Sequence, residues 1–136
     1  MISHRATEPT EQVIGGLNSV TERIIACAIE VHKQLGPGLL EAIYESALCV
    51  EFELAGLQYQ KQVPLGITYK GRPIGDLRLD LVVENLIIVE IKSVERMDPV
   101  FGAQVISYLR ASGKKIGLLI NFNSRLLKDG IKRFIL

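Results

Sequence analysis

Three charged residues in the middle of the chain have the types and spacing of a divalent-metal hydrolase site. Glu90 and Lys92 stand two residues apart, so they share a face on a β-strand, and Asp80 precedes them among Leu and Val residues. Charges at the end of an apolar strand cost free energy unless they pair or bind an ion. Two carboxylates supply the oxygen ligands that Mg²⁺ or Mn²⁺ prefers, and such a cation assists the hydrolysis of phosphate esters.

A lysine at such a site can position or deprotonate a water, or stabilise charge that develops in the transition state. The spacing alone is weakly specific, because Glu-x-Lys is also an ordinary surface ion pair. The elements that carry Asp80 and Glu90 therefore decide whether the two acids meet.

The hairpin between the two acids makes a testable prediction. Residues 77–84 alternate between apolar and polar, which places Leu77, Leu79, Leu81 and Val83 on one face of a strand. If residues 84–86 form a three-residue loop, Asp80 opposes Glu90 and the two acids share a face. A two-residue turn would put them on opposite faces. We expect the three-residue loop.

Hydrophobic period and the positions of glycine and proline predict the remaining elements. A Ser19–Glu22 capping box begins the first helix, Gly36-Pro37-Gly38 separates it from the second, and Asp98-Pro99 begins a third. The order of helix, helix, three strands, helix and two strands predicts an α/β domain with a mixed central sheet flanked by helices. The expected ranges are 19–35 and 39–54 for the first two helices, 58–84 for two strands, 86–91 for a buried central strand, 98–111 for the third helix, and 116–121 and 131–136 for the last strands.

Composition limits the class of protein. The 136 residues suit one domain, which we place at 18–136 behind a flexible leader at 1–17, and no apolar run approaches the ~20 residues of a membrane span. Cys27 and Cys49 lack a partner motif for zinc, and no secretory signal is evident, so we expect a cytoplasmic protein. A net charge of +1 excludes a uniformly basic coat protein. Residues 1–57 hold 3 basic and 8 acidic side chains, whereas residues 58–136 hold 13 and 7.

The flanking segments resemble the GxxExxY family of the PD-(D/E)XK nuclease superfamily. Gly38-x-x-Glu41-x-x-Tyr44 matches the signature after which that family is named, and the resemblance extends from about Ile24 to the C-terminus. The joint occurrence of its elements in order is much more specific than any one of them. The other elements are Tyr69-Lys70-Gly71, Arg78-x-Asp80, Glu90-x-Lys92, Gln104-x-x-x-Tyr108-Leu109 and the run from Gly117 to Phe122.

The resemblance implies a restriction-endonuclease-like αβββαβ core with one extra N-terminal helix. It implies that Glu41 is the first acid of a metal site, that Asp80 binds the metal, and that Glu90 and Lys92 are the acid and lysine of the core motif. The backbone carbonyl of Ile91 is the implied further ligand. The superfamily's usual proline before the aspartate is absent, since a leucine precedes Asp80.

Five of the matching or neighbouring residues have a second interpretation. Gln104 and Tyr108 are spaced to share a helix face, where they either orient Lys92 or a DNA phosphate, or pack structurally. His32 either supports the site through a metal or phosphate contact or is a packed, hydrogen-bonded histidine. Tyr44 either hydrogen-bonds the site or lies in the core. Glu41 also suits the dipole at a helix N-terminus.

The sequence thus predicts a nuclease that uses Mg²⁺ or Mn²⁺ to hydrolyse phosphodiester bonds of nucleic acid, with DNA as the expected substrate. The alternative is a catalytically silent module that keeps the nuclease fold and binds nucleic acid or a protein partner. A third interpretation is an ion-paired structural domain without a nucleotide role. We also expect a homo-oligomer, because the terminal strand at 131–136 can pair across a dimer.

Overall fold

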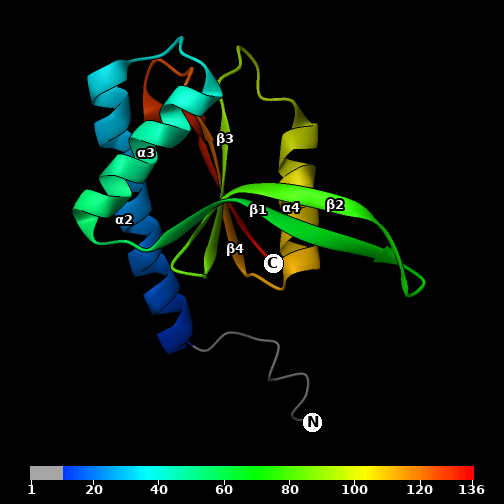
Figure 1. The fold of residues 1–136 in the computed structure, drawn as a ribbon. Coiled ribbons are helices and arrows are strands. Elements are labelled where there is room, and N and C mark those ends of the chain that lie inside the picture. Colours follow the sequence, from blue (N-terminus) through cyan, green and yellow to red (C-terminus); the bar gives the residue numbers. More distant parts are fainter. Residues whose placement is uncertain (1–10) are drawn as a thin grey trace.

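The computed structural model describes residues 11–136, and Figure 1 shows their arrangement. Two helices precede three strands, and a third helix, a fourth strand, a short 3-10 helix and a fifth strand follow. The predicted order of the α-helices and strands is confirmed, whereas the 3-10 helix was not expected. The bounds are α2 Glu11–Leu35, α3 Glu41–Ala55, β1 Tyr59–Tyr69, β2 Arg72–Val83, β3 Ile87–Lys92, α4 Pro99–Ser112, β4 Ile116–Asn121, η1 Leu127–Gly130 and β5 Ile131–Ile135.

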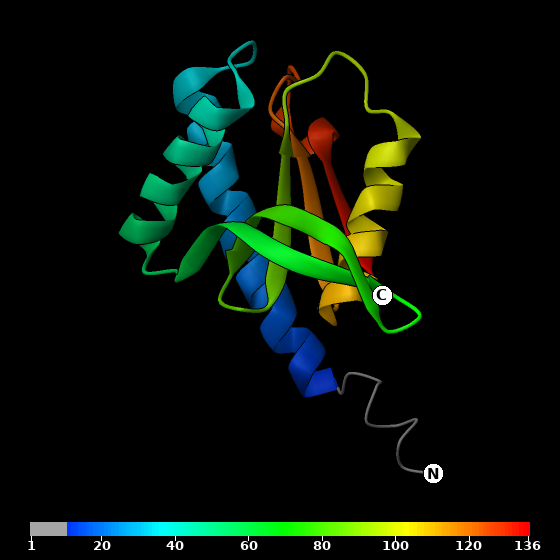
Figure 2. The same ribbon diagram turned by 45° about the vertical axis from the view of Figure 1, so that its right-hand side comes forward.

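The five strands form one mixed sheet in the order β1-β2-β3-β4-β5. Only β3 and β4 run parallel, and α4 provides the crossover between them, as a parallel connection requires (Figure 2). The other neighbours are antiparallel. This arrangement confirms the predicted α/β class with a mixed sheet and is consistent with a restriction-endonuclease-like core.

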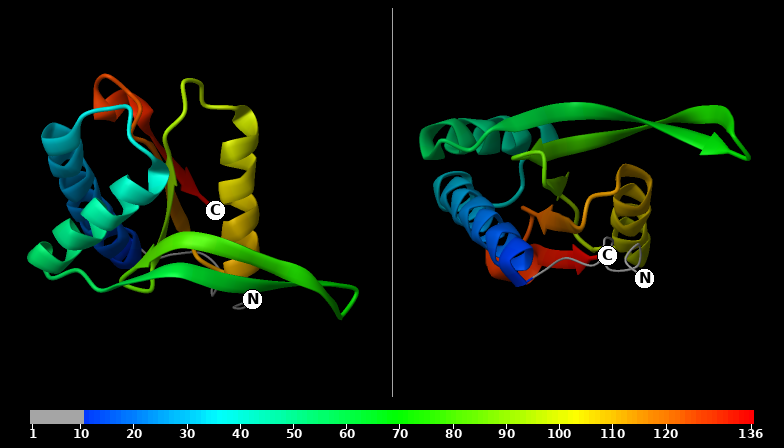
Figure 3. Two further views of the ribbon diagram at one scale, coloured as in Figure 1. Left: turned by 45° about the horizontal axis from the view of Figure 1, so that its top comes forward. Right: turned by 90° about the horizontal axis from the view of Figure 1, so that it is seen from below.

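Helices cover both faces of the sheet (Figure 3). On one face, α2 and α3 pack on a large apolar cluster that includes Leu81, Val89 and Ile120. On the other face, α4 packs on a smaller cluster that includes Val82 and Ile88. The central strands β3 and β4 are therefore buried from both sides, which explains why they read as uninterrupted aliphatic runs.

The first helix begins earlier than expected. Helix α2 already includes Glu11, so the predicted start at Ser19 is wrong, and residues 11–17 are helical where a leader was expected. Leu17 is buried in the apolar cluster, and its carbonyl accepts a hydrogen bond from Thr21 Oγ1 at 2.8 Å. This packing continues the helix through the capping motif. The remainder of the expected leader, residues 1–10, lies outside the described residues.

The β1–β2 hairpin changes faces along its length. Leu81 belongs to the cluster under α2 and α3, whereas Leu79 belongs to the cluster under α4. The expectation that these alternate residues share one face is therefore wrong. The regular β1–β2 pairing is interrupted at this point, between the pairs Lys61–Leu81 and Val63–Leu79, and Gln62 has a left-handed φ of 53°. A residue in this conformation interrupts the regular pleat and rotates the ribbon.

Helix α4 begins and ends at the residues that the sequence indicates, within one position. The Asp98 side chain caps α4 by accepting the Val100 N–H at 2.9 Å, and α4 ends at Gly113 in the left-handed conformation. Both cysteines are free and buried. Among the described residues, no helix has the length and apolar character needed to cross a membrane.

Candidate active site

Two hydrogen bonds between side chain and backbone join the segments that carry Asp80 and Glu90. The Asp80 N–H donates to Glu90 Oε2 at 2.8 Å, and the Ile91 N–H donates to Asp80 Oδ2 at 2.8 Å. The regular ladder between β2 and β3 ends just before this point, at Leu81 and Val89. The two carboxylates therefore take the place of the next backbone–backbone hydrogen bonds between β2 and β3, where the strands diverge.

The turn between β2 and β3 sets this register. Glu84 and Asn85 have φ values of 54° and 55°, and the Leu86 N–H donates to the Val83 carbonyl at 3.0 Å. These two left-handed residues, followed by Leu86, make the three-residue loop that the sequence predicts. Leu81 pairs with Val89, as the register that sets Asp80 opposite Glu90 requires, although the regular pairing stops one residue short of the two acids.

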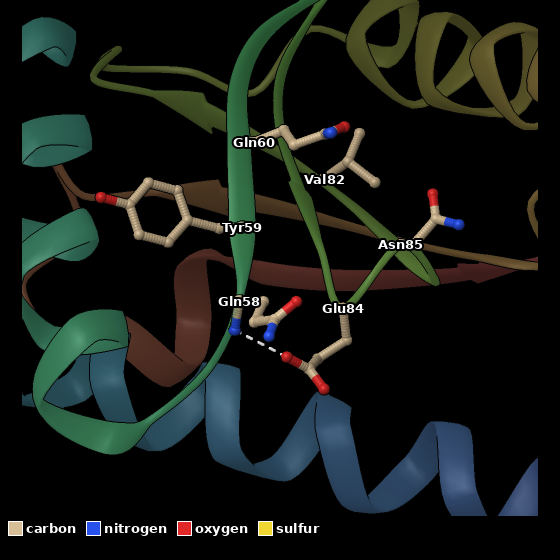
Figure 4. Close-up of a pocket in the computed structure, with 6 residues that line it drawn as sticks. All are labelled: Gln58, Tyr59, Gln60, Val82, Glu84 and Asn85. Atoms are coloured by element: carbon tan, nitrogen blue, oxygen red, sulfur yellow. Dashed lines mark hydrogen bonds between the residues drawn. The ribbon is translucent and has the colours of Figure 1, made fainter.

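A pocket of about 280 Å³ lies beside this turn (Figure 4). Glu84 Oε2 accepts the Gln58 N–H there at 2.6 Å, which ties the turn to the start of β1. The pocket contains none of the predicted site residues. Its lining residues are Gln58, Tyr59, Gln60, Val82, Glu84 and Asn85.

An open cleft of about 240 Å³ brings helix α3 to Asp80. Glu41 in the first turn of α3 lines the cleft, as does Glu45 one turn later, together with Asp80 and Ile91. Gln62 of β1 lies in the same cleft, and its Nε2 donates to Glu45 Oε1 at 2.8 Å. The sequence interpretation missed Glu45 and Gln62. The spacing of four residues between Glu41 and Glu45 was a usable signal for Glu45, because it puts them on one helix face.

The acids at this site repel one another in a partly dehydrated environment. Glu90 is only 6% exposed, and burial, followed by repulsion from Asp80, raises its pKa to about 8. Burial also raises the pKa of Asp80, although the Ile91 N–H and the Lys92 ammonium oppose the rise. Burial is likewise the main reason that the pKa of Glu45 is raised, and repulsion from Asp80 adds to it. A cation bound among these carboxylates would offset both the burial of their charge and their mutual repulsion.

The donor set fits a hard divalent cation. Asp80 and Glu90 each engage a backbone N–H through one oxygen, which leaves the second oxygen of each carboxylate for a ligand. Glu41 and Glu45 add carboxylates from α3 on the opposite side of the cleft. Within residues 11–136, the side chains of His, Cys, Asp and Glu do not form a group of three or more already placed to hold an ion.

Lys92 lies at the end of β3 on the side of the sheet that faces α4. Its Nζ is 4.5 Å from the centroid of the Phe101 ring, a cation–π contact with the first turns of α4. In the register, Lys92 pairs with Asn121 of β4. The strand end therefore presents the lysine beside α4, whereas the carboxylates of α3 approach Asp80 from the other helix layer.

Asn121 holds the segment that follows Lys92. The Asn121 side chain is 5% exposed, accepts the Val94 N–H at 3.1 Å through Oδ1, and donates to the Val94 carbonyl at 2.9 Å through Nδ2. The Phe122 N–H donates to the Lys92 carbonyl at 2.9 Å. These bonds fix the path of the chain directly after the candidate lysine.

Helix α4 carries the next two predicted residues in different environments. Tyr108 is half-buried against the apolar cluster of α4, and its pKa is raised first by burial and then by the negative charges of Glu90 and Asp80. The Tyr108 hydroxyl therefore lies within the electrostatic reach of the site. Gln104, one turn earlier, is exposed.

Tyr44 and His32 make structural contacts outside the cleft. The Tyr44 ring is fully buried and stacks on Phe122 with centroids 4.6 Å apart. Its hydroxyl donates to the Gly36 carbonyl at 2.5 Å and accepts the Leu39 N–H at 3.1 Å, which clamps the elbow between α2 and α3. His32 Nε2 lies 2.7 Å from the carbonyl of Ser124. These are the packed, hydrogen-bonded roles that were one of the two alternatives for each residue.

Comparison with known protein families matches residues 18–134 to the PD-(D/E)XK nuclease superfamily. No curated protein and no solved structure matches the chain significantly. The family match covers most of the chain, including α3, which borders the cleft, and strands β1 to β4 in full. The narrower GxxExxY assignment stays a prediction. On this match and this fold, the chain belongs to the PD-(D/E)XK nuclease superfamily.

Proposed function

We propose that this protein is a Mg²⁺- or Mn²⁺-dependent nuclease that hydrolyses phosphodiester bonds, with DNA as its substrate. The superfamily implies a nucleic acid substrate and typically uses a divalent metal. The observation that carries the proposal is the pairing of Asp80 with Glu90 at the divergence of β2 and β3. A buried and a half-buried carboxylate held together against their own repulsion are costly for a fold, and a bound cation explains the arrangement.

In this proposal the cation is held by Asp80, Glu90, the Ile91 carbonyl and a carboxylate of α3. Glu41 is the acid that the resemblance assigns to this role, and Glu45 lies in the same cleft. When bound, the cation supplies positive charge that stabilises the negative charge of a phosphate under attack. The backbone N–H groups that hold Asp80 and Glu90 keep both carboxylates in place before the substrate arrives.

The remaining residues position the reactants. The ammonium of Lys92 donates hydrogen bonds to the attacking water or to a phosphate oxygen, from the α4 side of the sheet. We assign support of Lys92 or of a substrate phosphate to Tyr108 and Gln104, one turn apart on α4. Tyr44 and His32 keep the structural roles that their contacts indicate.

The test is a cleavage assay on single- and double-stranded DNA and RNA with Mg²⁺ or Mn²⁺. We expect cleavage that EDTA abolishes and that Lys92→Met reduces by at least about 100-fold, because removal of one transition-state donor has effects of that size. The methionine keeps an apolar stem against Phe101 while it removes the ammonium. Lys128→Met, which alters an exposed lysine on η1, is the matched control and should retain activity.

The silent module is the alternative outcome of the same experiment. If no form of nucleic acid is cut with either metal, the nuclease assignment is wrong. Calorimetry with Mn²⁺ then separates the alternatives. Absent binding, or binding that Asp80→Asn leaves unchanged, would indicate a nuclease fold that binds its partner without metal chemistry.

We also propose that two copies of the chain pair through β5. This strand lies at one edge of the sheet, and Ile135 next to the C-terminus is 58% exposed. An edge strand offers unpaired N–H and C=O groups to a second strand. Light scattering at micromolar concentration should give the mass of a dimer, and a monomer would contradict this part of the proposal.

A further inference from the structure

The β1–β2 hairpin extends beyond the layered core. Its strands run from Tyr59 to Tyr69 and from Arg72 to Val83, which makes them the longest in the sheet. Figure 3 shows the hairpin crossing the sheet and continuing past α4 to a free tip. At the tip, Lys70 and Gly71 have φ values of 48° and 79°, the pattern of a tight two-residue turn.

Only the part of the hairpin near the sheet is packed. Val63, Leu65 and Leu79 contact the apolar cluster under α4 and brace the ribbon there. Further out, residues 68–76 are all exposed. We call residues 66–76 the hairpin arm; all of them except Ile67 are exposed. The arm therefore adds little to the stability of the folded core, and we look for its role outside the core.

The exposed charges of the hairpin are mostly positive. Lys61, Lys70, Arg72 and Arg78 are all exposed, and Asp76 is the only acid between residues 61 and 79. At the tip, Tyr69 is 61% exposed, with Lys70 Nζ 5.5 Å from the centroid of its ring. An exposed ring next to two cations is a combination that suits a sugar–phosphate backbone and its bases.

We propose that the hairpin arm binds the phosphate backbone of duplex DNA alongside the bond that is cut. This inference rests on the proposed nuclease function and adds the surface that holds the substrate. A two-stranded ribbon fits the major groove of B-form DNA, which is about 12 Å wide. The deep, narrow major groove of A-form RNA does not admit it. The shape of the arm therefore favours duplex DNA over duplex RNA.

The length of the arm sets the position of the contact. Arg72 is eight residues from Asp80 along β2, a span of about 26 Å at roughly 3.3 Å per residue. A duplex rises about 3.4 Å per base pair, so the tip reaches a phosphate about 8 base pairs from the bond that is cut. Duplexes too short to reach the tip should not respond to changes in the arm.

The experiment measures binding without cleavage, in the Lys92→Met background with Mg²⁺. A labelled duplex DNA of about 30 base pairs, longer than the predicted reach at 3.4 Å per base pair, is titrated at several salt concentrations. We expect the double variant Lys70→Gln/Arg72→Gln to bind about 10-fold more weakly near physiological salt, and the slope of log K against log salt to fall by about 1.8. The tip glycine is unchanged, so the turn is preserved.

The matched control is Lys33→Gln/Lys128→Gln, which removes two exposed cations from α2 and η1. It should leave the slope unchanged. Duplex RNA of the same length should lose less affinity with the double variant than duplex DNA does. A duplex of about 5 base pairs should show little difference between the double variant and its parent, because at about 3.4 Å per base pair it cannot span the site and the tip.

Two results would overturn the inference, and they are distinguishable. If the parent binds duplex DNA and the double variant binds with the same affinity and slope, the arm is not the contact, and its charges only keep an exposed edge strand from pairing. If the parent binds no nucleic acid at any salt concentration, the proposed function itself is wrong and the role of the arm fails with it.

Discussion

The amide N–H of Asp80 donates to the carboxylate of Glu90, while the carboxylate of Asp80 accepts the N–H of Ile91, the residue after Glu90. Two acids thus complete a backbone ladder at the point where its strands part. Their carboxylates serve the fold and the candidate chemistry together. Substitutions that keep the hydrogen bonds but remove the charge can separate these two contributions.

Asp80→Asn and Asp80→Ala should differ in stability. The asparagine oxygen can still accept the Ile91 N–H, whereas alanine leaves that N–H without its partner. We expect Asp80→Ala to lower the free energy of unfolding by about 1–3 kcal/mol and Asp80→Asn to lower it much less. Urea unfolding measures both, and Asp76→Ala on the exposed arm is the control, with a change within about 0.5 kcal/mol.

The same asparagine variant should fail to bind metal. In calorimetry with Mn²⁺, Asp80→Asn should weaken the affinity by at least about 10-fold, the lower end of the effect of disturbing the surroundings of a metal ligand. Equal destabilisation by the two substitutions would contradict the role of the Ile91 hydrogen bond, and unchanged Mn²⁺ affinity in Asp80→Asn would show that the charge of Asp80 has no part in a metal site.

The stability of the metal-free protein should fall as the pH rises. Burial raises the pKa of Glu90 to about 8 and also raises that of Asp80. An acid with a higher pKa in the folded state binds more protons when folded, so its folded form is favoured at low pH. Between about pH 5 and pH 8 we expect the melting temperature to decrease, and Glu90→Gln should flatten the decrease because the amide does not ionise.

Differential scanning calorimetry in EDTA at several pH values measures this slope. Saturating Mg²⁺ should reduce the slope in the parent protein, since the cation offsets the charge that deprotonation creates. A melting temperature that rises over this range, or an equal slope in Glu90→Gln, would contradict the prediction.

At position 62, glycine should give a more stable protein than alanine. Its φ of 53° is unfavourable for residues with a Cβ, so Gln62→Gly should be more stable than Gln62→Ala by about 1 kcal/mol. Gln60, on the same strand, is the matched control, and there glycine should be the less stable choice by about 0.5–1 kcal/mol. Thermal unfolding of the four variants is the measurement, and the same order at both positions would be inconsistent with a strained kink at Gln62.

Tyr44→Phe should affect the fold and leave metal binding intact. The variant keeps the stacking on Phe122 but loses the hydroxyl that bridges Gly36 and Leu39. We expect a loss of about 1–2 kcal/mol in the free energy of unfolding, because a partly buried carbonyl and N–H lose their partner. A large fall in Mn²⁺ affinity without loss of stability would instead support the role of Tyr44 in the site.

Local features of the sequence were sufficient to predict most of the element order. Gly56 and Gly113 end helices in the left-handed conformation that suits glycine, and Asp98 caps α4 with its own side chain. The turn residues Glu84 and Asn85 left two loop lengths open, and the three-residue loop was expected because it puts Asp80 and Glu90 on one face; the loop then fixes which residues oppose each other. That parity was enough to bring Asp80 and Glu90 together.

By itself, the sequence determined most of the elements, the β2–β3 register and the hairpin that brings Asp80 and Glu90 together, since all of these depend on neighbours within a few residues. Only the tertiary structure decided that Glu45 and Gln62 join Asp80 in one cleft, and that His32 contacts Ser124 across 92 residues of chain. It also decided that Leu79 and Leu81 face different helices. The hydrophobic pattern of a strand predicts which side chains share a face only while the pleat is regular. Here a left-handed residue on the neighbouring strand, Gln62, interrupts the pleat, and Leu79 and Leu81 face different sides of the sheet.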